Sequence, residues 1–110
     1  KWSHFVGRER HALVAFIEND PPGGSLSLVM EGVLKKIDKS KLNLVVAENW
    51  RIPQIIEEQG VTDFPAIYFY KAGMKTYSMK YEGVLTAKAI SKWAMDKVME
   101  LDEWENLEDY

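Results

Sequence analysis

The sequence predicts a mixed α/β domain in which a central β-sheet carries helices on both faces. Three apolar runs, at residues 12–17, 42–47 and 66–70, are short and bounded by turn-forming residues, as buried strands are. Apolar residues at helical spacing separate the first two runs, and this order of strand, helix and strand is typical of a parallel pair with a right-handed crossover. With 110 residues, 46% of them hydrophobic, the chain suits one domain with a sizeable core.

Residues 2–10 precede the first strand and are mostly polar, which predicts a short helix or turn. Its apolar anchors are Trp2, Phe5 and Val6. His4 and His11 flank this segment, and neither has an acidic or thiol side chain at metal-ligand spacing. We therefore expect both histidines to be solvated or capping residues rather than ligands.

A segment rich in Pro and Gly, residues 18–25, separates the first strand from an amphipathic helix. The apolar positions of this helix are Leu26, Val29, Met30, Val33, Leu34 and Ile37. Ser25 or Asp20 can cap its start. The strand of residues 42–47 follows, and together these elements form a β-α-β unit.

The next helix is expected to run to Gln59. Asn49 can cap it, and Pro53 is tolerable only in its first turn. Gly60 comes after the apolar positions Ile52, Ile55 and Ile56 of this helix, and a glycine there suits the left-handed residue beyond a helix end.

The second half continues with two strands and a helix. Pro65 stands at the start of the buried strand 66–70, where a missing backbone N–H is tolerated. Residues 75–81 alternate, with Tyr77, Met79 and Tyr81 on one side, which predicts a half-buried antiparallel strand. Thr86 is expected to cap a last helix whose apolar positions are Ala87, Ile90, Ala94, Val98 and Leu101.

The stretch Gly60 to Gly73 carries a recognisable pattern. It reads as a helix end, Gly-Val, two polar residues, aromatic-Pro, a buried strand and a Lys-x-Gly turn, and it resembles the second half of a thioredoxin domain. The similarity is greatest to domains of the protein disulfide isomerase family and calsequestrin, and it covers about residues 12 to 100. The resemblance implies a thioredoxin-like fold (βαβ then ββα) and a cis peptide bond between Phe64 and Pro65 beside the family's active site.

The resemblance also implies where the catalytic residues would lie. Alignment on the first strand puts Pro21 and Gly24 at the two positions of the Cys-x-x-Cys motif, and Ala15 at the position of the buried acid. The chain has no cysteine. Disulfides, cysteine-bound metal and thiol catalysis are therefore excluded, because disulfide exchange proceeds by thiolate attack.

A peptide-binding groove survives in this interpretation. Its candidate residues are Asp20, Pro21, Pro22, Gly23, Gly24, Phe64 and Pro65. In catalytic members of the family, the backbone beside this proline pairs with an extended substrate segment, which is strand addition and needs no thiol. Alternatively, the loop is only a connector and Phe64 only a core residue.

The formal net charge of −3 comes from the acidic end of the chain. Residues 102–110 contain five carboxylates and no base, and we divide the chain into a domain of residues 1–101 and a tail or linker of residues 102–110. Three interpretations of the tail stay open: a solvated linker, a helix that docks a partner, or a weak Ca²⁺ site. The last lacks the spacing of a Ca²⁺-binding loop.

These observations predict a redox-inactive, non-enzymatic binding or scaffold module, one of several domains in a protein of the disulfide isomerase type. Its expected partners are a protein or an unfolded peptide, with no cofactor and no metal. Nucleic acid and membrane insertion are not expected, because there is no basic stripe and no apolar run of ~18 residues. The resemblance implies the endoplasmic reticulum lumen or another secretory compartment and a chaperone role. The alternatives are a calsequestrin-like Ca²⁺-storage domain and an enzyme using non-thiol chemistry.

Overall fold

A computed structural model of the chain describes residues 2, 5–18, 25–48 and 51–108. Within them the elements are β1 (His11–Ile17), α1 (Ser25–Lys36), β2 (Leu42–Glu48), α2 (Pro53–Glu58), β3 (Ala66–Tyr70), β4 (Met79–Lys80) and α3 (Ala87–Glu108). The strands of this described part form one sheet in the order β2-β1-β3-β4. The predicted β-α-β unit, the later helix and the β-β-α unit are all confirmed.

Strand β1 lies at the centre of the sheet. It pairs in parallel with β2, with Leu13 opposite Leu44, and antiparallel with β3, with Leu13 opposite Phe69. Every residue of β1 and of β3 is buried. The prediction that these continuous apolar runs form strands covered on both faces of the sheet is therefore confirmed.

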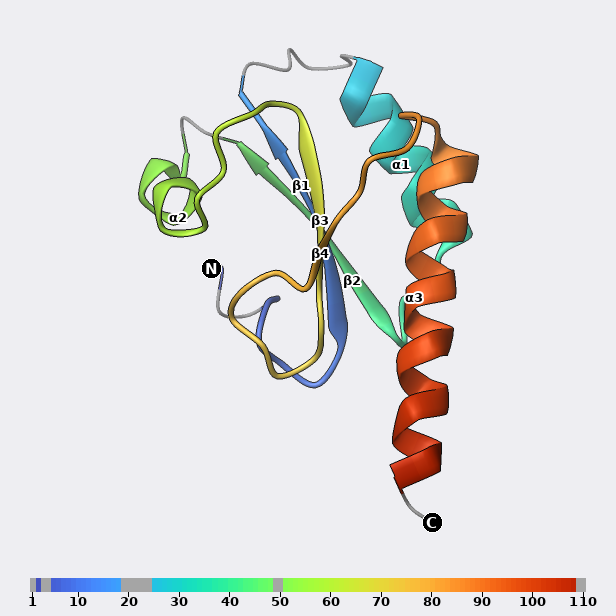
Figure 1. Cartoon of the computed structure of the whole chain (residues 1–110). Helices are drawn as coiled ribbons and strands as arrows, with labels where there is room; N and C mark the ends of the chain where they lie inside the picture. Colours follow the sequence, from blue (N-terminus) through green and yellow to red (C-terminus); the bar gives the residue numbers. More distant parts are fainter. Residues whose placement is uncertain (1, 3–4, 19–24, 49–50, 109–110) are drawn as a thin grey trace.

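The two faces of the sheet are covered differently, as Figure 1 shows. We call the side covered by α1 and α3 the helical face; its core is Leu13, Ala15, Ile17, Leu26, Met30, Val33, Ile37, Leu42, Ile67, Phe69, Tyr81, Ile90, Ala94 and Val98. We call the opposite side, covered by α2 and the N-terminal turn, the aromatic face; its core is Val6, Ala12, Val14, Phe16, Ala47, Ile56, Val61, Ala66, Tyr68 and Tyr70.

Gly32 lets α1 and α3 approach closely on the helical face. A Cβ atom at this position would lie 2.8 Å from the Cβ of Ala87, which is closer than side-chain carbons pack. The two helices descend side by side in Figure 1. Helix α3 begins as predicted, because the Oγ1 atom of Thr86 accepts a hydrogen bond of 3.2 Å from the backbone N–H of Ala89.

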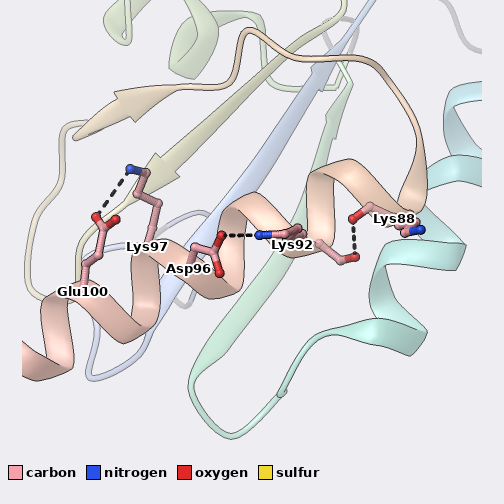
Figure 2. A network of polar contacts seen from close by, with 6 residues as sticks. Lys88, Lys92, Asp96, Lys97 and Glu100 are labelled. Atoms are coloured by element: carbon pink, nitrogen blue, oxygen red, sulfur yellow. Dashed lines mark hydrogen bonds and ion pairs between the residues drawn. The ribbon is translucent and has the colours of Figure 1, made fainter.

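The exposed side of α3 carries pairs of opposite charge (Figure 2). The Nζ atom of Lys92 lies 3.1 Å from Asp96, and that of Lys97 lies 3.4 Å from Glu100. Such solvated pairs contribute little each, about 0.3–0.5 kcal/mol. The helix continues to Glu108, so the division expected after residue 101 falls inside α3. Whether residues 102–110 act as a separate unit stays a prediction.

Helix α2 ends by the mechanism that Gly60 predicted. Gly60 has a φ of 70°, its N–H donates to the carbonyl of Glu57, and the N–H of Val61 donates to the carbonyl of Ile56. These two bonds form a Schellman motif. The start was predicted less well, because the N-cap residue is Ile52 with no side-chain cap. Pro53 lies in the first turn, as expected, where its preset φ suits the helix and its missing N–H removes one group that would need a partner. The N-cap position expected for Asn49 is thus occupied by Ile52; Asn49 itself lies outside the described residues.

The prediction of a strand over residues 75–81 was wrong in extent. Only Met79 and Lys80 form β4, and Tyr77 and Tyr81 lie on opposite faces of the sheet. The reason is aromatic packing: the ring centroid of Tyr77 lies 4.4 Å from that of Tyr68 on the aromatic face, which draws residues 75–77 off the sheet edge. Tyr81 instead packs into the helical face and donates its hydroxyl to the carbonyl of Val84.

The N-terminal segment forms the expected turn, but with two anchors rather than three. The N–H groups of Phe5 and Val6 both donate to the carbonyl of Trp2. The Trp2 ring packs edge-on against Tyr70, with centroids 5.5 Å apart, and Val6 is buried. Phe5 was expected to be an anchor and is 44% exposed, because the turn directs it away from the aromatic face.

Candidate functional site

The described half of the candidate groove lies at the N-terminal end of β3. The peptide bond between Phe64 and Pro65 is cis, the geometry that the resemblance implied. Ala66 pairs with Phe16, so Pro65 lies just beyond the last paired residues, at the end of the sheet where β1 leaves towards α1 (Figure 1). Pro65 is exposed, and Phe64 is half-buried against the aromatic face.

The other half of the candidate groove, Asp20 to Gly24, lies outside the described residues. The positions of its two flanks are known: β1 ends at Ile17 and α1 begins at Ser25. The cap that Asp20 was expected to provide also falls outside the described part, and so does the side chain of Ser25. Whether these loop residues face Phe64 and Pro65 stays a prediction.

The backbone next to Pro65 has an unpaired side. On the β4 side of β3, the carbonyls of Phe69 and Ile67 accept hydrogen bonds from the N–H groups of Ser78 and Tyr81. The chain then turns away, and no described segment continues this pairing towards Pro65. Because alternate residues of a strand face the same neighbour, the Pro65 carbonyl is the next acceptor on this side.

The charged groups near this end of β3 are solvated. Asp63 precedes Phe64, and its carboxylate lies 3.9 Å from the Nζ atom of Lys80. The Asp63 side chain is 82% exposed, so this ion pair holds the chain only weakly. The surroundings of Phe64 therefore offer an apolar ring and backbone acceptors rather than a buried charge.

Neither tyrosine of β3 is an acid-base group at neutral pH. Burial raises the pKa of the Tyr70 hydroxyl, which donates to the Oε1 atom of Gln59 at 2.8 Å. Burial also raises the pKa of Tyr68, against a smaller lowering effect of Lys80. A raised pKa keeps a phenol protonated, so neither ring supplies a nucleophile or a base.

The redox machinery of a disulfide oxidoreductase is absent from this chain. There is no cysteine in the sequence, and Ala15, at the position that the alignment gives to the family's buried acid, is a fully buried core residue. A thiolate must attack in disulfide exchange. The chain is therefore not a thiol-disulfide catalyst.

A small polar pocket lies at the opposite end of the sheet. Its volume is about 220 Å³ and it is lined by Glu9, Arg10, His11, Ser40, Lys41, Ala72 and Asp102. His11 was expected to be solvated or capping, and the first alternative is wrong, because only 6% of its surface is exposed. Its Nδ1 atom accepts a 2.8 Å hydrogen bond from the backbone N–H of Ala72.

Metal and membrane signals were also sought within the described residues. No group of three or more His, Asp or Glu side chains there is arranged to hold a metal ion. None of the helices in this part of the chain is long and apolar enough to cross a bilayer. The carboxylate side chains after Asp102 are not described, so the Ca²⁺ interpretation of the tail stays a prediction.

Comparison of the structure with solved proteins identifies the fold. The zinc-bound form of human ERp44 superimposes with a TM-score of 0.75 at 13% identity, over 88% of this chain and 30% of that one. The J-Trx1 fragment of ERdj5 gives 0.69 at 19% identity, over 82% and 42%. The oxidised thioredoxin of Plasmodium falciparum gives 0.66 at 16% identity, over 88% of both chains.

The chain has a thioredoxin-like fold. The last comparison decides the extent of the fold, because a complete thioredoxin and this chain cover each other almost fully. At identities below 20% these likenesses establish the architecture and not the activity.

Sequence comparison adds a shorter match. The chain is 35% identical over 46 residues to protein disulfide-isomerase A2 of Pongo abelii. The match includes 42% of this chain and only 9% of that protein. No family model matches the sequence. The predicted thioredoxin-like fold, similar to disulfide isomerase domains and without a Cys-x-x-Cys motif, is thus confirmed.

Proposed function

We propose that this chain is a non-enzymatic thioredoxin-like module that binds an extended peptide, or a loop of a partner protein, at the end of the sheet formed by Asp20–Gly24 and Phe64-Pro65. The observation that carries the proposal is the unpaired side of β3 beside the exposed Pro65. On the β4 side of β3, the last acceptor with a partner among the described residues is the carbonyl of Ile67, and the half-buried ring of Phe64 lies beside the stretch that follows towards Pro65.

Strand addition is the interaction that suits this site. An extended segment supplies backbone N–H groups that pair with acceptors at a sheet edge, and side chains add specificity. The Pro65 carbonyl is such an acceptor, while the proline itself has no N–H to offer. The exposed part of the Phe64 ring supplies an apolar contact for a side chain of the segment.

We further propose that the module belongs to a larger protein of the disulfide isomerase type, with a chaperone or scaffold role beside catalytic domains. The match to protein disulfide-isomerase A2 supports this, as do the solved likenesses that are longer than this chain. A secretory compartment such as the endoplasmic reticulum lumen is consistent with the same similarity, because disulfides form in oxidising compartments.

The affinity of such a site is expected to be weak. Few side chains would be buried, and ordering a flexible peptide opposes binding, so dissociation constants in roughly the micromolar to millimolar range are expected. Weak binding suits a module that holds many different unfolded segments for a short time.

The test is a matched pair of variants, Phe64→Ala and Met99→Ala. Met99 is 58% exposed on α3, far along the chain from the groove, and serves as the control for losing an exposed apolar side chain. We expect Phe64→Ala to weaken binding of an unfolded peptide about fivefold to tenfold, and Met99→Ala to leave it unchanged. Because Phe64 is only half-buried, its loss should cost less than about 2 kcal/mol of unfolding free energy.

Two results would contradict the proposal. If Phe64→Ala binds the peptide as tightly as the wild-type protein, the Phe64 ring does not contact the peptide. A loss of about 3–5 kcal/mol of stability without a specific loss of binding would make Phe64 a core residue, as the alternative interpretation holds. Denaturant midpoints and fluorescence titrations of the three proteins measure both quantities.

A further inference from the structure

His11 connects two segments that are far apart in sequence. It is the first residue of β1, and its partner Ala72 lies 61 residues later, in the turn that follows β3. The Nδ1 atom of the ring accepts the backbone N–H of Ala72 at 2.8 Å. The ring also packs on Phe69, with centroids 5.5 Å apart. The imidazole is thus held in one orientation between the sheet and the turn.

This hydrogen bond requires a particular protonation state of the imidazole. A neutral ring has one nitrogen with a proton and one that accepts, whereas both nitrogens of the imidazolium are donors. An accepting Nδ1 therefore requires the neutral tautomer with its proton on Nε2. Protonation of Nδ1 would place two N–H groups against each other and end the bond.

The charged groups that line the pocket with His11 come from three parts of the fold. Glu9 and Arg10 immediately precede β1, Lys41 precedes β2, and Asp102 lies on α3. The Nζ atom of Lys41 lies 3.5 Å from Asp102, and the guanidinium of Arg10 donates to the carbonyl of Lys39 at 2.8 Å. Two cations and two carboxylates line this pocket beside His11, and the hydrogen bond from Ala72 can be accepted only by the neutral ring.

The turn has a second attachment that does not titrate. The N–H of Gly73, which has a φ of 81°, donates to the carbonyl of Arg8 at 2.9 Å. The two attachments join the turn between β3 and β4 to the first residue of β1 and to the segment just before it. Loss of the bond to His11 would leave the bond between Gly73 and Arg8 in place.

We propose that His11 is a pH-sensitive latch, which fastens the turn at Ala72 to β1 at neutral pH and releases it when the imidazole is protonated. An imidazole titrates near pH 6.5 in model peptides, so release belongs to mildly acidic conditions. The released segment leads into residues 75–77 and Tyr77, which cover part of the aromatic face. The latch therefore makes the packing of this face depend on pH.

The expected size of the effect follows from linkage. If the open turn binds a proton like an ordinary imidazole and the closed turn does not, the open population grows by up to about 30-fold from pH 7.5 to pH 5. The protection factor of the Ala72 amide in hydrogen exchange, which divides out the intrinsic effect of pH, should fall by that factor. The Ala94 amide, at a fully buried residue in α3, provides the reference for global unfolding.

The two histidines allow a matched comparison. In His11→Asn, an amide oxygen takes a position near that of Nδ1 and does not titrate, so protection of Ala72 should no longer depend on pH. In His4→Asn, the dependence should remain. NMR of the wild-type imidazoles should show the Nε2–H tautomer for His11 at neutral pH.

The proposal is overturned if the ratio of Ala72 to Ala94 protection in the wild-type protein stays constant between these pH values. It is also overturned if His4→Asn abolishes the dependence, or if His11 carries its proton on Nδ1 at neutral pH. The wild-type and His4→Asn measurements decide the question even where His11→Asn does not fold.

Discussion

The two faces of the sheet are covered by elements of different length. The helical face is covered by α1 and α3, whose 12 and 22 residues pack against each other and against aliphatic side chains. The aromatic face is covered by the six residues of α2, a turn at Trp2 and the ring of Tyr77. Long helices cover a core continuously, whereas short pieces leave gaps at their ends.

This difference in covering elements indicates which side of the sheet can rearrange more easily. The candidate groove at Phe64-Pro65 and the turn at Ala72 both border segments that cover the aromatic face. Binding regions and regions that open locally are drawn from the less stable parts of a structure. The helical face then acts as the rigid support, and the aromatic face as the part that responds to ligands and to pH.

We expect the largest change in unfolding free energy when a buried isoleucine is replaced by alanine, and each face of the sheet contains a buried isoleucine. Ile90 of α3 lies fully buried on the helical face, and Ile56 of α2 lies buried on the aromatic face. We expect Ile90→Ala to lose about 4 kcal/mol of unfolding free energy, because two long helices cannot collapse into the cavity. Ile56→Ala should lose about 2 kcal/mol, since the short α2 can move inward.

Urea denaturation of both variants measures this difference. Equal losses of unfolding free energy would show that the two faces are equally rigid. A larger loss for Ile56→Ala would show that the aromatic face is the more rigid one.

A smaller effect is expected from two tyrosine hydroxyls, one on each face. Tyr70→Phe removes the hydrogen bond to Gln59, and Tyr81→Phe removes the one to the Val84 carbonyl. Each loss should cost about 1 kcal/mol at neutral pH. The raised pKa of Tyr70 adds a pH dependence: its stabilising contribution is complete below about pH 10 and is lost as the pH rises above that value.

Thermal unfolding between neutral pH and about pH 11 tests this sign. The wild-type protein should lose more stability on the alkaline side than Tyr70→Phe does. The same alkaline loss in both proteins would mean that Tyr70 ionises as easily in the folded chain as in the unfolded one.

The sequence predicted those elements whose signal is local. The strands β1, β2 and β3 were placed to within one residue, because each is a short apolar run between breakers. The ends of α2 and α3 at Gly60 and Thr86 were also predicted from single residues with defined roles. Local periodicity and capping chemistry are sufficient for these features.

The sequence-based predictions were wrong where contacts between residues far apart in the chain determine the local structure. The alternation of residues 75–81 predicted a strand, yet the packing of Tyr77 on Tyr68 and Tyr70 ended β4 early. His11 was expected to be solvated or capping, and its burial was not predicted, because no neighbouring residue in the sequence indicates a partner 61 residues away. For the groove, the sequence indicated the position of Phe64 and Pro65, and their function remains a proposal because the backbone pairing that matters involves a second molecule.

The most direct test of the central claim is a map of where a peptide binds to the wild-type chain. The backbone amides of the protein are followed by NMR while an unfolded peptide is added. We expect saturable shifts centred on Phe64, Ala66 and Ile67 and on residues 18–25, with no change at exposed apolar residues elsewhere, such as Leu28 and Met99. Shifts confined to α1 and α3, or no saturable shift at millimolar peptide, would contradict it.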